Sequence, residues 1–188
     1  MNRAVFLDRD GTINIDYGYI SDEGDISYFP DVFSSLLRLQ TGGFKLIVVS
    51  NQGGIALGYL DPETSGRINK RVVSDFAREG IIISGVYTCP HHPRGGAKWN
   101  DPDCRCRKPR PGMLKDAAAE HDIDLKASFM VGDKITDVGA GRNAGCSTVL
   151  VLTGQGKQAL SERQSWEYLP DFIADNLKEA ADHILGES

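Results

Sequence analysis

The chain has 188 residues and a formal net charge of −5 at neutral pH, which argues against a surface that binds nucleic acid. Its length is typical of one domain with a substantial core, and no apolar run approaches the length of a membrane span. The first residues lead directly into an apolar segment without the organisation of a signal peptide, so we expect a cytoplasmic protein. We therefore expect a single domain over residues 1–188.

The apolar run at residues 4–7 predicts a buried parallel strand that ends at Asp8. Asp10 follows two residues later, and Gly11 allows the chain to turn away. Ligands of open α/β sheets bind outside the carboxyl ends of the strands. The two carboxylates are therefore placed to act as a nucleophile and an acid/base partner, although two aspartates can also form this motif by chance.

Residues 13–30 predict a long polar and aromatic loop, with the sequence DYGY at residues 16–19. A loop of this length beside a candidate site is more often functional than idle. Asp31 is the expected N-cap of a following helix, which the glycines at residues 42–43 should end.

The β-branched run at residues 44–49 is the strongest strand signal in the chain. It is followed by Ser50, Asn51, Gln52 and then Gly53. Such a turn can offer a hydroxyl and backbone N–H groups to an anion, although a plain strand-to-helix turn has a similar composition.

Asp61 and Pro62 have the residue types of a helix start, and this helix should end near Gly80. Residues 81–88 should form the next strand. Because helices alternate with apolar strands, the pattern predicts a doubly wound, mostly parallel α/β sheet.

Residues 89–108 interrupt this alternation with three cysteines, Cys89, Cys104 and Cys106. Three thiols and one imidazole at short spacing suit a closed, structural zinc site. The turn after Cys89 favours His91 as the fourth ligand, and His92 is the alternative. Reduced thiols without a metal also remain possible, whereas Cys146 lies apart and is expected in the core.

Arg107 and Lys108 follow this loop directly, so a bound metal would fix where the two cations point. A rigidly held arginine and lysine suit a phosphate group, and a solvated basic patch is the alternative. Pro111 should begin a helix that ends near His121.

The strand expected at residues 128–132 leads to Asp133, with Lys134 and Asp137 beyond it. Magnesium in proteins is commonly held by one or two carboxylates together with water and a substrate phosphate. Asp8 and Asp133 would provide these carboxylates.

Residues 148–152 should form a fifth strand. The segment 153–170 reads as a polar connection. Residues 171–173 then lead to a terminal helix. No long uncovered apolar stretch is evident, so we expect a monomer.

Four motifs resemble, in order, those of the haloacid-dehalogenase-like (HAD-like) phosphatases. They are residues 8–12 (DRDGT), Ser50 with Asn51, Lys108, and Gly132 with Asp133 and Asp137. The resemblance covers nearly the whole chain, and the cysteine-containing loop resembles the zinc-binding branch of the family. Within that branch, residues 16–19, 89–93 and 106–113 resemble the heptose-bisphosphate phosphatases more than the histidinol-phosphate phosphatases.

The resemblance implies a Rossmann-like fold with a minimal cap and a zinc-stapled loop at residues 89–108. It implies Mg²⁺-dependent hydrolysis of the 7-phosphate of a heptose 1,7-bisphosphate, in nucleotide-activated heptose biosynthesis. A histidinol-phosphate phosphatase is the nearest alternative. A non-catalytic module that binds phosphosugars is a more distant one.

The resemblance also implies roles for individual residues. Asp8 would be the nucleophile and Asp10 the acid/base, while Ser50 and Lys108 would bind the transferring phosphoryl oxygens. Asp8, the Asp10 carbonyl oxygen and Asp133 would hold Mg²⁺.

The remaining roles concern the surroundings of that metal and the rest of the substrate. Asp137 would orient waters on the metal or Lys134. The residues implied for the sugar and its second phosphate are Asp16, Tyr17, Gly18, Tyr19, Ser50, Asn51, Gln52, Gly53, Arg107, Lys108 and Lys134.

Overall fold

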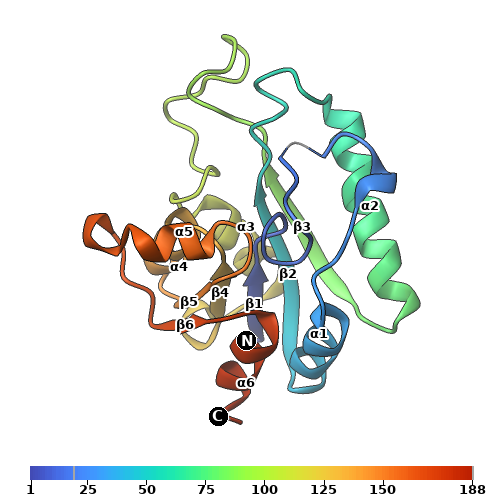
Figure 1. Cartoon of the computed structure of the whole chain (residues 1–188), viewed down its shortest axis with the longest axis vertical. Coiled ribbons are helices and arrows are strands. Elements are labelled where there is room, and N and C mark those ends of the chain that lie inside the picture. The colour runs from blue at the N-terminus through green and yellow to red at the C-terminus, as the bar shows by residue number, and fades with distance from the viewer. Residues whose placement is uncertain (19, 188) are drawn as a thin grey trace.

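The computed structural model describes residues 1–18 and 20–187 and contains one six-stranded sheet in which every pairing is parallel (Figure 1). The strand order is β3-β2-β1-β4-β5-β6. The strands are β1 (Arg3–Leu7), β2 (Phe44–Asn51), β3 (Ile83–Cys89), β4 (Phe129–Gly132), β5 (Ser147–Val151) and β6 (Phe172–Ala174). The predicted doubly wound α/β sheet is confirmed, with β6 as a strand beyond the five expected.

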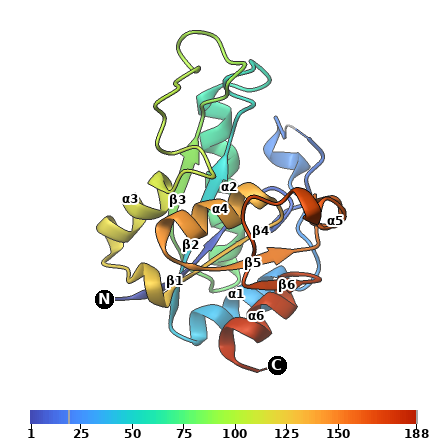
Figure 2. The same cartoon turned by 90° about the vertical axis from the view of Figure 1, so that its left-hand side faces the viewer.

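Helices cover both faces of the sheet (Figure 2). They are α1 (Val32–Thr41), α2 (Pro62–Arg78), α3 (Gly112–His121), α4 (Ile135–Ala144), α5 (Gly156–Ser161) and α6 (Leu177–Leu185), with short 3₁₀ turns at Glu23–Asp25, Leu125–Ala127 and Arg163–Ser165. Side chains alternate across β1, so Val5 and Leu7 join a core with α1, α2 and α6, while Ala4 and Phe6 join a second core with α3 and α4. Burial on both faces explains the continuous apolar runs of the strands.

The two predicted helix starts differ in detail. Asp61 caps α2 as expected, because its carboxylate accepts the Thr64 N–H at 2.7 Å and Pro62 opens the helix. Asp31 is also the N-cap of α1, as expected. Its backbone is left-handed (φ 63°), a conformation that aspartate tolerates, and its side chain makes no capping hydrogen bond.

Two other boundaries also differ from the sequence prediction. β3 begins at Ile83 rather than at residue 81, because the N–H of Ile81 donates to Phe76 and that of Ile82 donates to Gln40. Segment 153–170, expected as a polar connection, contains α5 and a 3₁₀ turn. The Trp166 indole N–H donates to the Ala159 carbonyl at 2.8 Å and closes this segment on itself.

β1 lies between β2 and β4, so the chain order reverses direction across the sheet at β1. This is the position where open α/β sheets bind ligands. The loop after β3 projects beyond the same carboxyl end of the sheet, beside the 52–61 connection (Figures 1 and 2). Among the described residues, no helix combines the length and apolar character needed to cross a membrane.

Candidate active site

Three neighbouring strand ends deliver the predicted polar residues to one place. Leu7 of β1 is paired with Val48 of β2 and with Val131 of β4, so the residues that follow these strands lie at a common edge. A cleft of about 660 Å³ opens there. Its lining includes Asp8, Asp10, Asp16, Gly18, Ser50, Asn51, Gln52, Gly53, Arg107, Lys108 and Lys134.

Two predicted substrate residues are not part of this lining as described. The Tyr17 side chain is 68% exposed and borders a separate hollow beside the 3₁₀ turn at Glu23–Asp25. Tyr19 lies outside the described residues. The predicted 13–30 loop therefore reaches the cleft through Asp16 and Gly18.

Lys108 lies at the centre of the site and is buried. Its Nζ is 2.7 Å from Asp8 Oδ1 and 2.6 Å from Asp137 Oδ1, and it donates to the Val49 carbonyl at 2.8 Å. Burial opposes its charge, but the carboxylates of Asp137 and Asp8 outweigh this effect and raise the pKa of Lys108. A permanent cation therefore lies beside Asp8.

The Asn51 side chain fixes the backbone of Lys108. Its amide donates to the Lys108 carbonyl at 3.1 Å, and its oxygen accepts the Lys108 N–H at 3.0 Å. Asn51, predicted to contact the sugar, therefore has its side chain engaged in holding this loop.

Asp133 is a buried carboxylate whose two oxygens differ. Oδ2 accepts the Gln155 N–H at 2.8 Å, whereas Oδ1 has no hydrogen-bond partner within the described part of the chain. Gly11 and Gly154 both have positive φ, and a methyl group at either one would overlap the Asp133 carboxylate. These glycines allow two backbone segments to enclose the carboxylate.

Ligand oxygens of Asp8, Asp133 and Asp137 all lie within 4.8 Å of one another. Burial raises the pKa of Asp133 to about 8. Burial also raises the pKa of Asp8, to about 6, although the charge of Lys108 opposes this increase. A divalent cation would offset the repulsion among the three carboxylates. It would also bind Asp133 Oδ1, which accepts no hydrogen bond within the described residues. The donor set therefore fits a magnesium-type ion.

Asp137 contacts both Lys108 and the backbone of Lys134. One of its oxygens contacts Lys108 Nζ, and the other accepts the backbone N–H of Lys134 at 3.0 Å, at the start of α4. It therefore contacts the Lys134 backbone rather than the Lys134 ammonium group, which lies 3.7 Å from Asp16 Oδ2.

Asp10 has a different environment from Asp8, although the two are only two residues apart. Arg9 donates to both of its oxygens, at 3.0 and 2.8 Å, Asn14 donates to Oδ1 at 3.0 Å, and Gln52 donates to Oδ2 at 2.8 Å. Burial alone would raise the pKa of Asp10, but Arg9 and these hydrogen bonds lower it. The pKa of Asp8 is therefore raised and that of Asp10 is lowered, so the two carboxyl groups differ in how readily they hold a proton.

The sequence reasoning missed Arg9 and Asn14 as parts of this site. The signal that could have indicated Arg9 was a cation placed between two acids directly after a buried strand. The Gln52 amide also donates to Ser50 Oγ at 2.7 Å, which leaves the Ser50 hydroxyl proton available to an acceptor.

The outer wall of the cleft contains Arg107 and His92. Arg107 Nη1 donates to the His91 carbonyl at 2.6 Å. A methyl group at Gly53 would lie 3.0 Å from the His92 ring and 3.4 Å from Arg107, so this position favours a small residue. His92, considered above only as a metal ligand, therefore lines the cleft instead.

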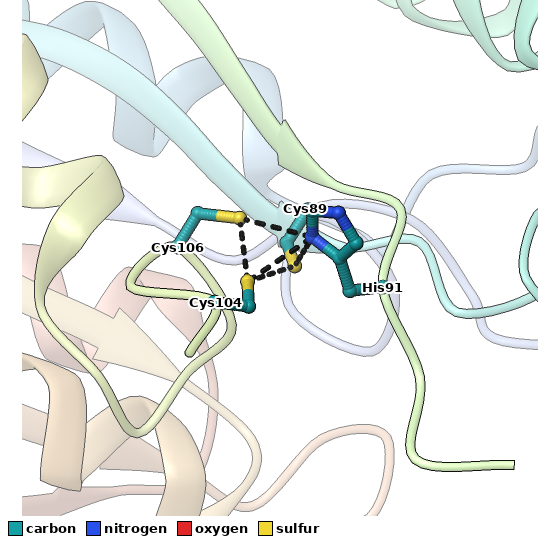
Figure 3. A group of neighbouring side chains, drawn as sticks. All are labelled: Cys89, His91, Cys104 and Cys106. Carbon is teal, nitrogen blue, oxygen red and sulfur yellow. Dashed lines mark hydrogen bonds between the residues drawn. The ribbon is translucent and has the colours of Figure 1, made fainter. Parts of the chain in front are cut away.

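The cysteine–histidine cluster lies at the carboxyl end of β3, whose last residue is Cys89 (Figure 3). Cys89 Sγ lies 3.6 Å from both His91 Nδ1 and Cys104 Sγ, and Cys104 Sγ lies 3.0 Å from Cys106 Sγ. Four soft ligands at such spacing fit one tetrahedral metal ion. Cys146 is buried in the second core and is not one of the residues of this group.

Both the sequence and the fold of the chain are similar to those of known proteins. The profile of the HAD-hydrolase-like family matches residues 105–180. The chain is 44% identical to a D-glycero-beta-D-manno-heptose-1,7-bisphosphate 7-phosphatase of Photorhabdus laumondii, over 92% of each protein. It is 41% identical to the Escherichia coli K12 protein of the same name, over 81% of this chain and 80% of the relative.

A solved structure has the same fold over almost the full length of both chains. It is the D,D-heptose 1,7-bisphosphate phosphatase of B. bronchiseptica, described as complexed with magnesium and phosphate. It is 31% identical, each chain covers 99% of the other, and the TM-score is 0.85.

Proposed function

Because this chain belongs to the HAD-like phosphatases, in the family of the D-glycero-β-D-manno-heptose-1,7-bisphosphate 7-phosphatases, we propose that it hydrolyses the 7-phosphate of that bisphosphate to give heptose 1-phosphate. The observation that carries this proposal is the meeting of Asp8, Ser50, Lys108 and Asp133 at one sheet edge. A nucleophile, a hydroxyl donor, a fixed cation and a metal ligand are the groups that phosphoryl transfer requires.

In the first step, an Asp8 oxygen attacks phosphorus in line with the bond to the sugar oxygen O7. A phosphorus–oxygen bond forms to Asp8 as the bond to O7 breaks, which gives an aspartyl-phosphate. Asp10 must first gain a proton, because its pKa is lowered in the resting site, and it then delivers this proton to O7 as the alkoxide leaves.

In the second step, water attacks the same phosphorus atom. Asp10, now ionised, takes a proton from this water, and the phosphorus–oxygen bond to Asp8 breaks. Phosphate leaves, and both carboxyl groups return to their initial states.

The three phosphoryl oxygens need donors that are already in place. The Ser50 hydroxyl and the Lys108 ammonium group would bind two of them, and both side chains are buried and fixed by neighbours. Donors that need no reorganisation stabilise a transition state more effectively than water does.

Mg²⁺ is the metal that we propose for the carboxylate site, held by Asp8, the Asp10 carbonyl oxygen and Asp133. When bound, it would neutralise charge between the nucleophile and the phosphate. The free buried oxygen of Asp133 supports this assignment, as does the magnesium named for the B. bronchiseptica relative. Asp137 would hold Lys108 in place beside this site.

Zn²⁺ is the metal that we propose for Cys89, His91, Cys104 and Cys106. All four ligand positions are filled by the protein, so the site would be structural. Thiolate ligands suit a reducing compartment, which supports a cytoplasmic location. We retain a monomer as the proposed state.

The rest of the substrate would lie against the outer cleft. Arg107 and Lys134 are the cations proposed for the 1-phosphate, with Asp16, Gly18 and Gly53 along the sugar. An arginine matches phosphate geometry with two parallel N–H bonds.

The direct test is phosphate release from the α and β anomers of the heptose 1,7-bisphosphate, with histidinol phosphate as a control. The names of the relatives lead us to expect faster release from the β anomer. A higher kcat/KM on histidinol phosphate would contradict the proposal. Tight binding of the bisphosphate without any phosphate release would favour a binding module instead.

A further inference from the structure

Arg9 is a fully buried charged side chain that the mechanism above does not use. It is 1% exposed and lies between the nucleophile and the acid/base in sequence. Its guanidinium donates from Nε to Asp10 Oδ1 at 3.0 Å and from Nη2 to Asp10 Oδ2 at 2.8 Å. Two parallel bonds of this kind fix the plane of a carboxylate as well as its position.

The third contact of Arg9 leads away from the cleft. Nη1 donates to the side-chain oxygen of Asn69 at 2.7 Å. Asn69 lies on α2, and it is not among the residues that line the cleft. Its neighbours Ile68 and Val72 are buried in the core, which fixes the helix against the sheet.

We propose that Arg9 and Asn69 are positioning residues for the Asp10 carboxyl group, a role that rests on the proposed function. Asn69 holds the outer end of the guanidinium, and the guanidinium in turn aligns both Asp10 oxygens. Proton transfer to a leaving oxygen depends strongly on the position of the acid. Asn69 of α2 thereby positions the Asp10 carboxyl group through Arg9.

The test compares two leaving groups. The C7 alkoxide of the heptose needs a proton as it leaves, whereas p-nitrophenolate leaves without one. The value of kcat/KM reports the first chemical step for both substrates. Loss of Asp10 alignment should therefore lower kcat/KM for the heptose bisphosphate and leave that for p-nitrophenyl phosphate nearly unchanged.

We expect Asn69→Ala to lower kcat on the bisphosphate about tenfold, with little change in KM, because acid/base catalysis contributes about 10²–10⁴-fold and only part of the alignment is lost. Asn69→Asp keeps an acceptor for Arg9 and should retain activity near wild type. Lys70→Ala, an exposed neighbour on α2, is the matched control. Arg9→Lys, which keeps the charge but loses the paired bonds, should lose more than Asn69→Ala.

If Asn69→Ala lowered kcat/KM equally for the heptose bisphosphate and for p-nitrophenyl phosphate, the proposal would be overturned. Equal decreases would indicate a general structural defect. An unchanged kcat on the bisphosphate would overturn the proposal as well, as would an Asn69→Asp variant as poor as Asn69→Ala. The proposed function is checked first with the wild-type chain. If the wild-type chain released no phosphate from the bisphosphate, both the proposed function and the positioning role would be contradicted. Normal release by Asn69→Ala would contradict only the positioning role.

Discussion

The carboxylate site and the cysteine–histidine cluster are both small groups of convergent ligands, but they are assembled differently. The carboxylate site takes Asp8, Ser50, Lys108 and Asp133 from distant parts of the chain, and it exists only because three parallel strands end together. The cluster takes its ligands from residues 89–106, that is, from the last residue of β3 and the loop that follows it.

The carboxylate site therefore depends on the sheet, whereas the cluster depends on ligands that lie close together in sequence. Lys108 joins the two sites because it follows Cys106 by two residues and yet contacts Asp8. The predictions below test how far the two regions depend on each other, and they run from the largest expected effect to the smallest.

Asp8→Asn should remove the nucleophile and reduce phosphate release by at least about 10³-fold, because loss of a covalent nucleophile costs more than loss of any single orienting group. Binding of the bisphosphate, measured by calorimetry, should survive, since Ser50 and Lys108 remain. Zinc content should be unchanged if the cluster is independent of the sheet edge. Full turnover by this variant would end the assignment of Asp8.

Asp10→Asn should lower kcat on the bisphosphate by about 10²-fold or more, the range of a general acid/base. The amide keeps the shape of the side chain but cannot donate or take the proton. Stopped-time phosphate assays at saturating substrate would measure the loss. Normal turnover would remove Asp10 from the mechanism.

Cys104→Ser should remove one ligand of the cluster. The zinc content, measured by metal analysis, should fall from about one zinc per chain in the wild type to none. We expect a lower Tm and roughly tenfold lower activity, because the loop then no longer fixes Arg107 and Lys108. Cys146→Ser is the matched control, since Cys146 is buried in the core and lies outside the cluster. If the wild-type protein contained no zinc and its stability did not change after treatment with a chelator, the proposed structural zinc site would be rejected.

Gly11→Ala should lower both stability and activity, because the new methyl group overlaps the Asp133 carboxylate at a positive φ. Gly145 also has a positive φ, but a methyl group there meets no atom within 4 Å. Gly145→Ala should therefore cost only the backbone strain of about 1–2 kcal/mol. Denaturant unfolding would measure the free energy of unfolding of both variants. Equal decreases for Gly11→Ala and Gly145→Ala would contradict a steric overlap with Asp133.

Asp133→Asn should stabilise the metal-free protein at alkaline pH, although it should impair the enzyme. The Asp133 pKa is raised to about 8 in the fold, so between about pH 4 and 8 the native chain keeps a proton that the unfolded chain releases. The free energy of unfolding must then fall as pH rises through this window, and asparagine removes that fall.

We expect the metal-free variant at pH 8 to gain at least about 3 °C in Tm over the wild type. Added Mg²⁺ should cancel or reverse this gain, because the ion favours the ionised Asp133. Asp25→Asn, at an exposed position, is the control. A wild-type Tm that is independent of pH in this range would contradict the buried, protonated state of Asp133.

Much of the fold could be predicted because apolar strands, helix starts and glycine stops are local signals. The exceptions are instructive. β6 has only three residues, and its pairing with β5 depends on a partner that is distant in sequence. The helix α5 gave no periodic apolar signal, because Gly156 is its only buried residue.

The sequence by itself determined which chemical groups follow which strands, since the order of apolar runs and polar turns is written along the chain. It also indicated the zinc-type ligand set, because those ligands lie close together in sequence. Only the tertiary structure decided that Lys108 lies between Asp8 and Asp137, that His91 rather than His92 faces the thiols, and that Arg9 contacts Asn69. These contacts join residues whose separation along the chain carries no signal, and they form because the parallel sheet and the loop after β3 bring those residues to the same edge.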